Sequence, residues 1–187
     1  MSESSVEREL KFADVDLGRL RDRLQSLEAE CQGSRALEDN WIFDRDGELA
    51  GRGSLLRLRV DRRGAILTFK GPASFEGSVK VRVEHESGVK DLESMRRILE
   101  GLGYEPVRRY QKYREEWRLG SITIALDHTP IGDFAEIEGE DCERVARRCG
   151  LDPDQVEKRN YLRLYEDYLV EHPDAPPDMV FPPSARS

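Results

Sequence analysis

The sequence of 187 residues has few of the residues and segments from which disulfide frameworks, zinc sites and membrane helices are built. Its three cysteines, Cys31, Cys142 and Cys149, are odd in number and have no metal-ligand spacing, which predicts free thiols. Its three histidines are scattered, so any metal would be held by carboxylate oxygen. No apolar run approaches the roughly 20 residues of a membrane helix, and the polar N-terminal segment has no signal-peptide core. We therefore expect a cytoplasmic protein with no membrane partner.

Charge, in contrast, is abundant. Charged residues make up 36% of the chain, and 38 acidic against 30 basic side chains give a formal net charge of -8. This balance disfavours nucleic acid as a partner, because proteins that bind it recruit phosphate with a net basic surface. Lys occurs only six times, so the other 24 basic residues are Arg, whose guanidinium can bind phosphate through two parallel hydrogen bonds. A short polyanion held inside the protein is compatible with an acidic exterior.

Alternation of apolar and polar residues predicts most of the secondary structure. It predicts strands over residues 6–12, 39–43, 56–60, 65–70, 79–86, 107–118, 121–127 and 134–138. Helical spacing predicts helices over residues 16–30, 91–102 and 142–149, and another after Pro153. The pattern favours a single α+β domain over residues 1–171. Residues 172–187 contain five of the nine prolines and should form an extended or disordered tail, on which Met179, Val180 and Phe181 could dock.

The polar face of strand after strand carries acids and strong bases rather than Thr, Ser or Gln. A sheet with one packed and one solvated face would explain each strand taken separately. The repetition instead favours closure into a barrel whose lumen gathers the charges while the apolar faces pack outward on helices. The charged positions are Glu7, Glu9, Lys11, Arg57, Arg59, Lys70, Lys80, Arg82, Glu84, Glu86, Lys112, Arg114, Glu136 and Glu138. Polyphosphate needs dense cationic neutralisation and its divalent cation needs carboxylates, so this mixture suits that ligand class.

The segment Glu7-Arg8-Glu9-Leu10-Lys11 matches the ExExK motif of the CYTH domains, also called triphosphate tunnel metalloenzymes. A lone ExExK motif has little specificity, since acids and lysine are common. The resemblance continues in order through residues 39–44, 53–59, 67–72, 112–114, 132–138 and 158–161, and covers residues from about 6 to 165. The sequence is therefore similar to this family over most of its length.

The resemblance implies an eight-stranded antiparallel β-barrel, closed into a tunnel and flanked by helices, that binds triphosphate substrates with Mg or Mn. It implies metal ligands at Glu7, Glu9, Glu136 and Glu138. It implies phosphate-binding bases at Lys11, Arg57, Arg59, Lys70, Lys112 and Arg114, and also at Arg82 with Glu84 beside it. Of these, Glu7, Glu9, Lys11 and Arg59 are the residues to which we assign catalysis. Two points stay open: whether Lys158 or Arg159 points inward, and whether Asp127 belongs to the site or caps a turn.

The resemblance leaves three functions to weigh. The first is a metal-dependent phosphohydrolase acting on inorganic tripolyphosphate, a nucleoside triphosphate or thiamine triphosphate. The second is an adenylate cyclase of the class IV type, which makes cyclic AMP and pyrophosphate from ATP and needs a nucleobase pocket as well. The third is a non-catalytic polyphosphate-binding module, against which the two intact glutamate pairs argue. The sequence does not specify the substrate or the preferred metal, and it leaves a homodimer open.

Overall fold

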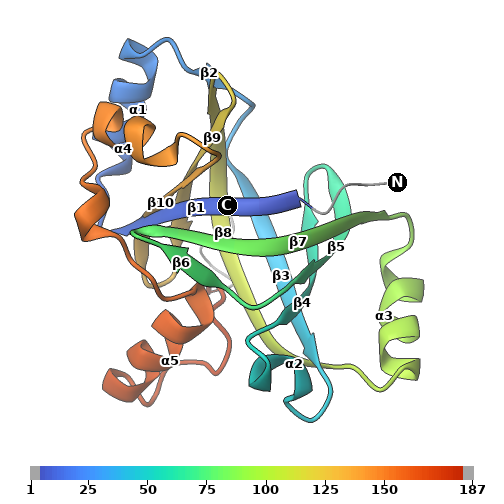
Figure 1. Ribbon diagram of the computed structural model, residues 1–187. Coiled ribbons are helices and arrows are strands. Elements are labelled where there is room, and N and C mark those ends of the chain that lie inside the picture. Colours follow the sequence, from blue (N-terminus) through green and yellow to red (C-terminus); the bar gives the residue numbers. More distant parts are fainter. Residues whose placement is uncertain (1–4, 183–187) are drawn as a thin grey trace.

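The computed structural model describes residues 5–182, and its central feature is a ring of eight antiparallel strands (Figure 1). The ring consists of β1 (Ser5–Ala13), β3 (Ala36–Asp44), β4 (Leu55–Asp61), β5 (Gly64–Lys70), β7 (Val79–Val89), β8 (Glu105–Leu119), β9 (Ile122–Thr129) and β10 (Gly132–Glu138). Their order is β1-β10-β9-β8-β3-β4-β5-β7, and β7 pairs with β1 to close the ring. Two short strands, β2 (Glu30–Cys31) and β6 (Ser74–Glu76), pair with β8 and β7 outside it. The predicted closed eight-stranded barrel is confirmed.

The first strand closes the barrel, and its pairing also fixes which side chains face the lumen. Glu9 lies opposite Glu138 of β10 on one side and opposite Lys80 of β7 on the other. Residues that lie directly opposite each other on paired strands share a face of the sheet. Because side chains alternate with a period of two, the neighbouring charges at Glu7 and Lys11 point into the same interior.

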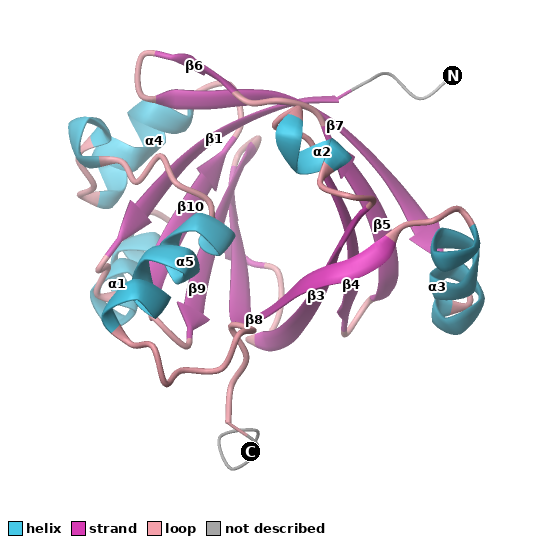
Figure 2. Cartoon of the chain, turned by 90° about the horizontal axis from the view of Figure 1, so that it is seen from below, coloured by secondary structure: helices cyan, strands magenta, loops and turns pink. Residues whose placement is uncertain are grey.

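The helices lie outside the ring (Figure 2). They are α1 (Leu17–Ser26), α2 (Glu48–Gly51), α3 (Leu92–Gly101), α4 (Cys142–Cys149), the 3-10 helix η1 (Pro153–Gln155) and α5 (Tyr161–Glu171). The longer helices α1, α3 and α5 begin at a side chain that accepts a backbone N–H: Asp16, Asp91 and Asn160. The predicted helix over residues 16–30 was too long, since Glu28 takes a positive φ of 57° and the chain turns there toward β2. Among residues 5–182, no helix is long and apolar enough to cross a membrane.

Most of the apolar core lies between the barrel and the helices, on the outer face of the strands. Beneath α1 and α4, the fully buried Leu24 and Val145 pack with Ile124 and Ile137. A second cluster lies beneath α3. A third lies beneath α5 and includes Ile42, Tyr110 and Phe134, which are on the inward faces of their strands. Cys142 and Cys149 are buried in the first cluster, Cys31 is exposed, and all three are free thiols as predicted. Packing outside the ring leaves most of the lumen to polar groups.

The C-terminal segment runs along the free edge of β8. Met179 accepts a hydrogen bond from the amide of Gln111 and donates one to the carbonyl of Arg109, and its side chain is buried. Phe181 packs against Tyr113, with ring centroids 4.9 Å apart. These contacts dock Met179 and Phe181 on the barrel. The final residues, 183–187, and the first four lie outside the part of the chain that the structure describes.

Residues 44–47 turn the chain after β3 and lead into the short helix α2, which sequence alone did not indicate. Asp44 organises it: its buried carboxylate accepts backbone N–H groups of Arg45, Leu49 and Ala50 at 2.7–3.0 Å. Burial raises the pKa of Asp44, but these three hydrogen bonds outweigh it and hold the pKa below its ordinary 3.8. The carboxylate therefore fixes the connection between β3 and β4 from which the arginines of β4 extend.

Replacing Asp44 with alanine should lower the free energy of unfolding at pH 7 by about 1–2 kcal/mol, the usual contribution of a helix-capping side chain. Because the folded-state pKa is lowered, this contribution is present above the ordinary pKa and is lost as the pH falls through the folded-state value. Urea unfolding at pH 7 and pH 3 should therefore show a smaller gap between wild type and Asp44→Ala at pH 3. Asp22→Ala, on the exposed side of α1, is the control. An equal gap at both pH values would contradict the assigned hydrogen bonds.

Candidate functional site

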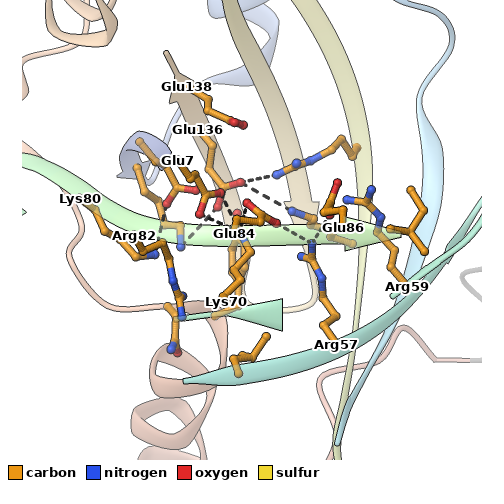
Figure 3. Close-up of a pocket in the computed structure, with 18 of the residues that line it drawn as sticks. Glu7, Arg57, Arg59, Lys70, Lys80, Arg82, Glu84, Glu86, Glu136 and Glu138 are labelled. Atoms are coloured by element: carbon orange, nitrogen blue, oxygen red, sulfur yellow. Dashed lines mark hydrogen bonds and ion pairs between the residues drawn. The ribbon is translucent and has the colours of Figure 1, made fainter. Parts of the chain in front are cut away.

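The barrel encloses a cavity of about 430 Å³ whose walls are almost entirely charged (Figure 3). Among residues 5–182, nine cationic side chains line it: Lys11, Arg57, Arg59, Arg63, Lys70, Lys80, Arg82, Lys112 and Arg114. Seven glutamates join them: Glu7, Glu9, Glu84, Glu86, Glu116, Glu136 and Glu138. The cavity therefore brings together all eleven residues that the sequence proposed for the site. Arg63, in the turn between β4 and β5, and Glu116, on β8, also line the cavity and were not among these eleven.

Three of the four predicted metal ligands form an acidic wall on β1 and β10. Both oxygens of Glu7 accept hydrogen bonds from Lys70 at 2.7 and 2.8 Å, and Glu9 lies 3.5 Å from Lys80. Glu138 is exposed to the cavity, and its partial burial together with the carboxylates of Glu7 and Glu9 raises its pKa to about 7. This raised pKa marks an excess of negative charge, and carboxylate oxygens are the donors that Mg²⁺ and Mn²⁺ favour. Within residues 5–182 no three acidic, His or Cys side chains are drawn together into a finished metal site.

Glu136, the fourth predicted ligand, lies instead among cations. It makes a short hydrogen bond to Arg114 and lies 3.3 Å from Lys11 and 3.7 Å from Lys112. Burial raises the pKa of Glu136, but Lys112, Arg114 and Lys11 outweigh this and hold it well below the ordinary value. Glu136 is thus an ionised group that arranges the bases of the wall, and it could reach a metal only by giving up some of these contacts.

Asp127 holds two of the bases that line the cavity, Lys112 and Arg114. Its carboxylate is completely buried and accepts hydrogen bonds from Lys112 at 2.9 Å and from two nitrogens of Arg114 at 2.6 and 2.7 Å. It also accepts the hydroxyl proton of Tyr161 at 2.8 Å. Of the two readings that the sequence left open, the structure supports a place in the site rather than a turn cap. Asp127 sets the direction of two predicted phosphate-binding bases.

Glu38 is a buried carboxylate of the site that the sequence analysis missed. It lies 3.8 Å from Lys112 and 3.9 Å from Arg59. Burial raises its pKa, but Arg114, Lys112, Arg59 and Arg57 hold it at about 2. The predicted strand began at residue 39, one residue too late to include this position, whereas β3 begins at Ala36. An earlier strand start would have shown Glu38 on the inward face.

Arg57 and Arg82 have contrasting surroundings. Arg57 lies in the lumen, 3.4 Å from both the Tyr110 hydroxyl and the Thr68 hydroxyl and 3.5 Å from Glu86. Arg82 instead donates two hydrogen bonds to the carbonyl of Gly71. Arg82 therefore fastens the connection after β5 as well as lining the cavity.

The structure shows which side chains of residues 158–161, at the start of α5, reach the lumen. Arg159 pairs with Glu157 and Asp167 on the outside, and Lys158 lies over the ring of Phe75 at 5.4 Å. Neither base lines the cavity, whereas Tyr161 does. Its ring lies 4.3 Å from the ammonium of Lys11 and 5.0 Å from that of Lys112, within the range of cation–π attraction. Residues 158–161 therefore contribute the aromatic ring of Tyr161, which lies against two lysines of the lumen.

Comparison with known proteins gives one family match and several relatives. The CYTH domain family matches residues 5–147. Adenylate cyclase CyaB of Aeromonas hydrophila is 28% identical over 181 residues, covering 88% of this chain and 90% of that protein. A protein of Methanocaldococcus jannaschii, named provisionally as an adenylate cyclase, is 24% identical over 172 residues, covering 85% of this chain and 98% of its own length.

Solved structures share the fold. A protein of Vibrio parahaemolyticus, also named provisionally as an adenylate cyclase, superposes with a TM-score of 0.78 at 23% identity and covers 88% of this chain and 99% of its own. A Hippeastrum protein with a TM-score of 0.62 and 16% identity covers 87% of this chain and 96% of its own. That protein is named as an adenylyl cyclase and described as having a dominant triphosphatase activity. At these identities the two structures support the barrel architecture alone.

Proposed function

This chain belongs to the CYTH domain family, and on that premise we propose that it is a divalent-metal-dependent phosphohydrolase that cleaves triphosphate substrates in its barrel lumen. The observation that carries the proposal is the cavity itself, with nine cations on its walls and an acidic group at β1 and β10. A triphosphate needs several fixed cations for neutralisation and a hard cation held by oxygen ligands. Both are present within one enclosed volume.

In the proposed reaction, a water oxygen forms a bond to the terminal phosphorus as the bond from that phosphorus to the bridging oxygen breaks. Tripolyphosphate then yields pyrophosphate and orthophosphate; the electron pair of the broken bond stays on the bridging oxygen, and the water proton passes to a carboxylate of the lumen and on to solvent. Lys11, Lys70 and Arg59 stabilise the charge that moves onto this oxygen. Bound Mg or Mn would neutralise and orient phosphoryl oxygens. We assign its ligands as Glu7, Glu9, Glu136 and Glu138.

The remaining bases bind the substrate in this proposal. Arg57, Lys112 and Arg114 lie on walls away from the acidic group, and Arg82 lies beside it on β7. Their ion pairs with Glu84, Glu136 and Asp127 hold the cations in place before the substrate arrives. Such preorganised charges need not rearrange during the reaction, which is the main source of their catalytic effect.

Arg59→Ala should lower kcat for tripolyphosphate about 100-fold, because removing one preorganised donor to a developing charge has an effect of that order. The side chain is largely buried and faces Glu38, which keeps its other cationic neighbours in the variant. Steady-state phosphate release with Mg²⁺ measures the effect, and circular dichroism confirms the fold. Arg97→Ala is the matched control. Arg97 forms an exposed ion pair on α3, and its replacement should leave full activity. Activity within twofold of wild type for Arg59→Ala would remove this residue from the site.

The proposal is tested by offering purified protein tripolyphosphate, ATP and thiamine triphosphate, each with Mg²⁺ or Mn²⁺. Orthophosphate, pyrophosphate and cyclic AMP are then resolved separately. Release of orthophosphate that depends on the metal is the expected result. Binding of tripolyphosphate without turnover in either metal would identify a polyphosphate-binding module instead.

The alternative function is adenylate cyclase, which the names of the relatives from Aeromonas and Methanocaldococcus favour. In that reaction the ribose hydroxyl attacks the α-phosphorus and pyrophosphate leaves, so a nucleobase must also be bound. The apolar side chains lining the cavity are few, namely Leu55, Ile66 and Leu162 beside two tyrosines. Hydrolysis needs no such pocket and is therefore the function that we propose first. Cyclic AMP as the main product from ATP would reverse this order.

A further inference from the structure

We propose that Tyr110 is a substrate-contacting residue, whose phenolic hydroxyl donates a hydrogen bond to a phosphoryl oxygen on the wall of the lumen formed by β8 and β4. The proposal rests on the function proposed above, since it assumes a polyphosphate in the cavity. It adds a neutral donor to a site built mostly from charges.

Tyr110 occupies an inward position of β8, two residues before Lys112 and four before Arg114. Its side chain lines the cavity and is buried, with 6% of the residue exposed. Sequence alone does not mark Tyr110 as a site residue, because an aromatic residue on a charged strand is most simply explained by packing. The ladder shows that it shares the lumen face with the bases that follow it.

The hydrogen bonds around Tyr110 determine where its phenolic proton can point. An NH of Arg57 lies 3.4 Å from the Tyr110 oxygen, and a guanidinium can only donate. The phenolic oxygen is therefore the acceptor in this contact, and its own proton must turn to another group. Within residues 5–182 the hydroxyl of Tyr110 donates no hydrogen bond to a side chain or carbonyl. The proton is left for a group that enters the cavity, and a phosphoryl oxygen is an acceptor of the right kind.

The electrostatic surroundings strengthen this donor. Burial raises the pKa of Tyr110, but Arg57 and Lys112 outweigh it and leave the pKa below its ordinary value. A more acidic phenol gives a stronger hydrogen bond to an anion. The same two cations attract the anion to this wall, so all three groups favour the same ligand.

The ring is also held rigidly before any ligand binds. It packs in a buried cluster with Ile42, Phe134 and Met179, and its centroid lies 6.1 Å from that of Tyr161. A fixed ring loses little side-chain entropy on binding, which makes the hydroxyl an effective contact.

The position of Tyr110 in the ring of strands indicates which part of the substrate it meets. β8 and β4 are each three strands away from β1, in opposite directions around the barrel. The acidic group on β1 and β10 and the pair formed by Tyr110 and Arg57 therefore lie on different walls, and Figure 3 shows Arg57 apart from Glu7 and Glu138. Tyr110 should contact a phosphoryl group remote from the metal, where it contributes to binding in the ground state and the transition state alike.

Tyr110→Phe tests the inference because it removes one oxygen and keeps the ring. KM for tripolyphosphate should rise about tenfold with kcat within twofold of wild type, the signature of a contact that binds equally in both states. Isothermal calorimetry on the protein in EDTA should show the Kd for tripolyphosphate rising by a similar factor. Tyr165→Phe is the matched control, since this buried hydroxyl donates to the carbonyl of Pro176 outside the cavity. It should leave KM and Kd unchanged.

Unchanged KM and Kd in Tyr110→Phe would overturn the inference, as would a fall in kcat alone. If the wild type binds tripolyphosphate without hydrolysing it, the proposed hydrolase activity is contradicted. The Kd values of the wild type and of Tyr110→Phe would still decide the role of Tyr110. A wild type that does not bind tripolyphosphate would overturn both.

Discussion

Glu9→Gln is expected to lower metal-dependent turnover of tripolyphosphate about 1000-fold while leaving the barrel folded. The substitution keeps the size of the side chain and removes its charge, so a cation loses an anionic ligand without a cavity forming. Glu9 lies between Glu138 and Lys80 in the strand ladders, and its ion pair with Lys80 is long, at 3.5 Å. Because little in the fold depends on this charge, its loss should act on the metal site rather than on stability.

A metal titration separates this explanation from a general loss of activity. The concentration of Mn²⁺ that gives half-maximal rate should rise at least tenfold in Glu9→Gln, and excess Mn²⁺ should restore part of the rate. Glu140→Gln, two positions beyond Glu138 and exposed outside the lumen, is the matched control and should behave as wild type. Wild-type turnover in Glu9→Gln at low metal would show that the acidic group on β1 holds no catalytic ion.

The inward faces of the strands could be predicted from sequence because the two-residue period is a local property of each strand. A strand with Glu7, Glu9 and Lys11 on one face keeps them together whichever neighbours it finds. Helix starts were also readable, since Asp16 and Asp91 act on the next turn of their own chain. The end of α1 was not, because the chain leaves the helix to form a pairing with β8, over 80 residues away.

The roles of individual charges depend on which strands become neighbours, and this is not a local property. Glu136 and Glu138 have the same alternation and the same residue type, so the sequence gives them one role. In the barrel, Glu138 faces the carboxylates of β1 while Glu136 meets three bases, and their pKa values shift in opposite directions. Asp127 and Tyr161 are coupled in the same way, by a hydrogen bond between residues 34 positions apart.

The charges that sum to -8 are unevenly distributed between the lumen and the exterior. Nine of the 30 basic side chains line one cavity of about 430 Å³, where seven glutamates accompany them. The remaining basic side chains are outnumbered on the exterior, which repels a long nucleic acid. A short polyanion that enters the lumen meets cations at close range and partly shielded from bulk solvent, where their attraction is stronger than on the exterior. The location of the cations therefore reconciles a short polyanion in the lumen with a composition that disfavours a long nucleic acid.

Asp127→Asn should lower the free energy of unfolding by about 3–5 kcal/mol, the largest stability effect that we expect in this protein. The carboxylate is completely buried and binds Lys112, Arg114 and the hydroxyl of Tyr161. An asparagine keeps the shape but removes the charge, so two cations in a low-dielectric interior each lose a counter-ion within hydrogen-bond distance. The new NH₂ group is a donor, and it would face Lys112 and Arg114, which can only donate, and the Tyr161 hydroxyl, which already donates to this position. Urea unfolding of the full chain at pH 7 measures the loss.

Asp39→Asn provides the comparison, since its partner Arg109 is paired at 2.5 Å but lies on the partly exposed outer side of β8. That pair is solvated, so its loss should lower the free energy of unfolding by about 1 kcal/mol or less. The difference between the two variants measures the effect of burial on otherwise similar aspartate–arginine pairs. A loss below about 1 kcal/mol in Asp127→Asn would mean that Glu38 and Glu136 alone can compensate Lys112 and Arg114, and that Asp127 does not organise the wall.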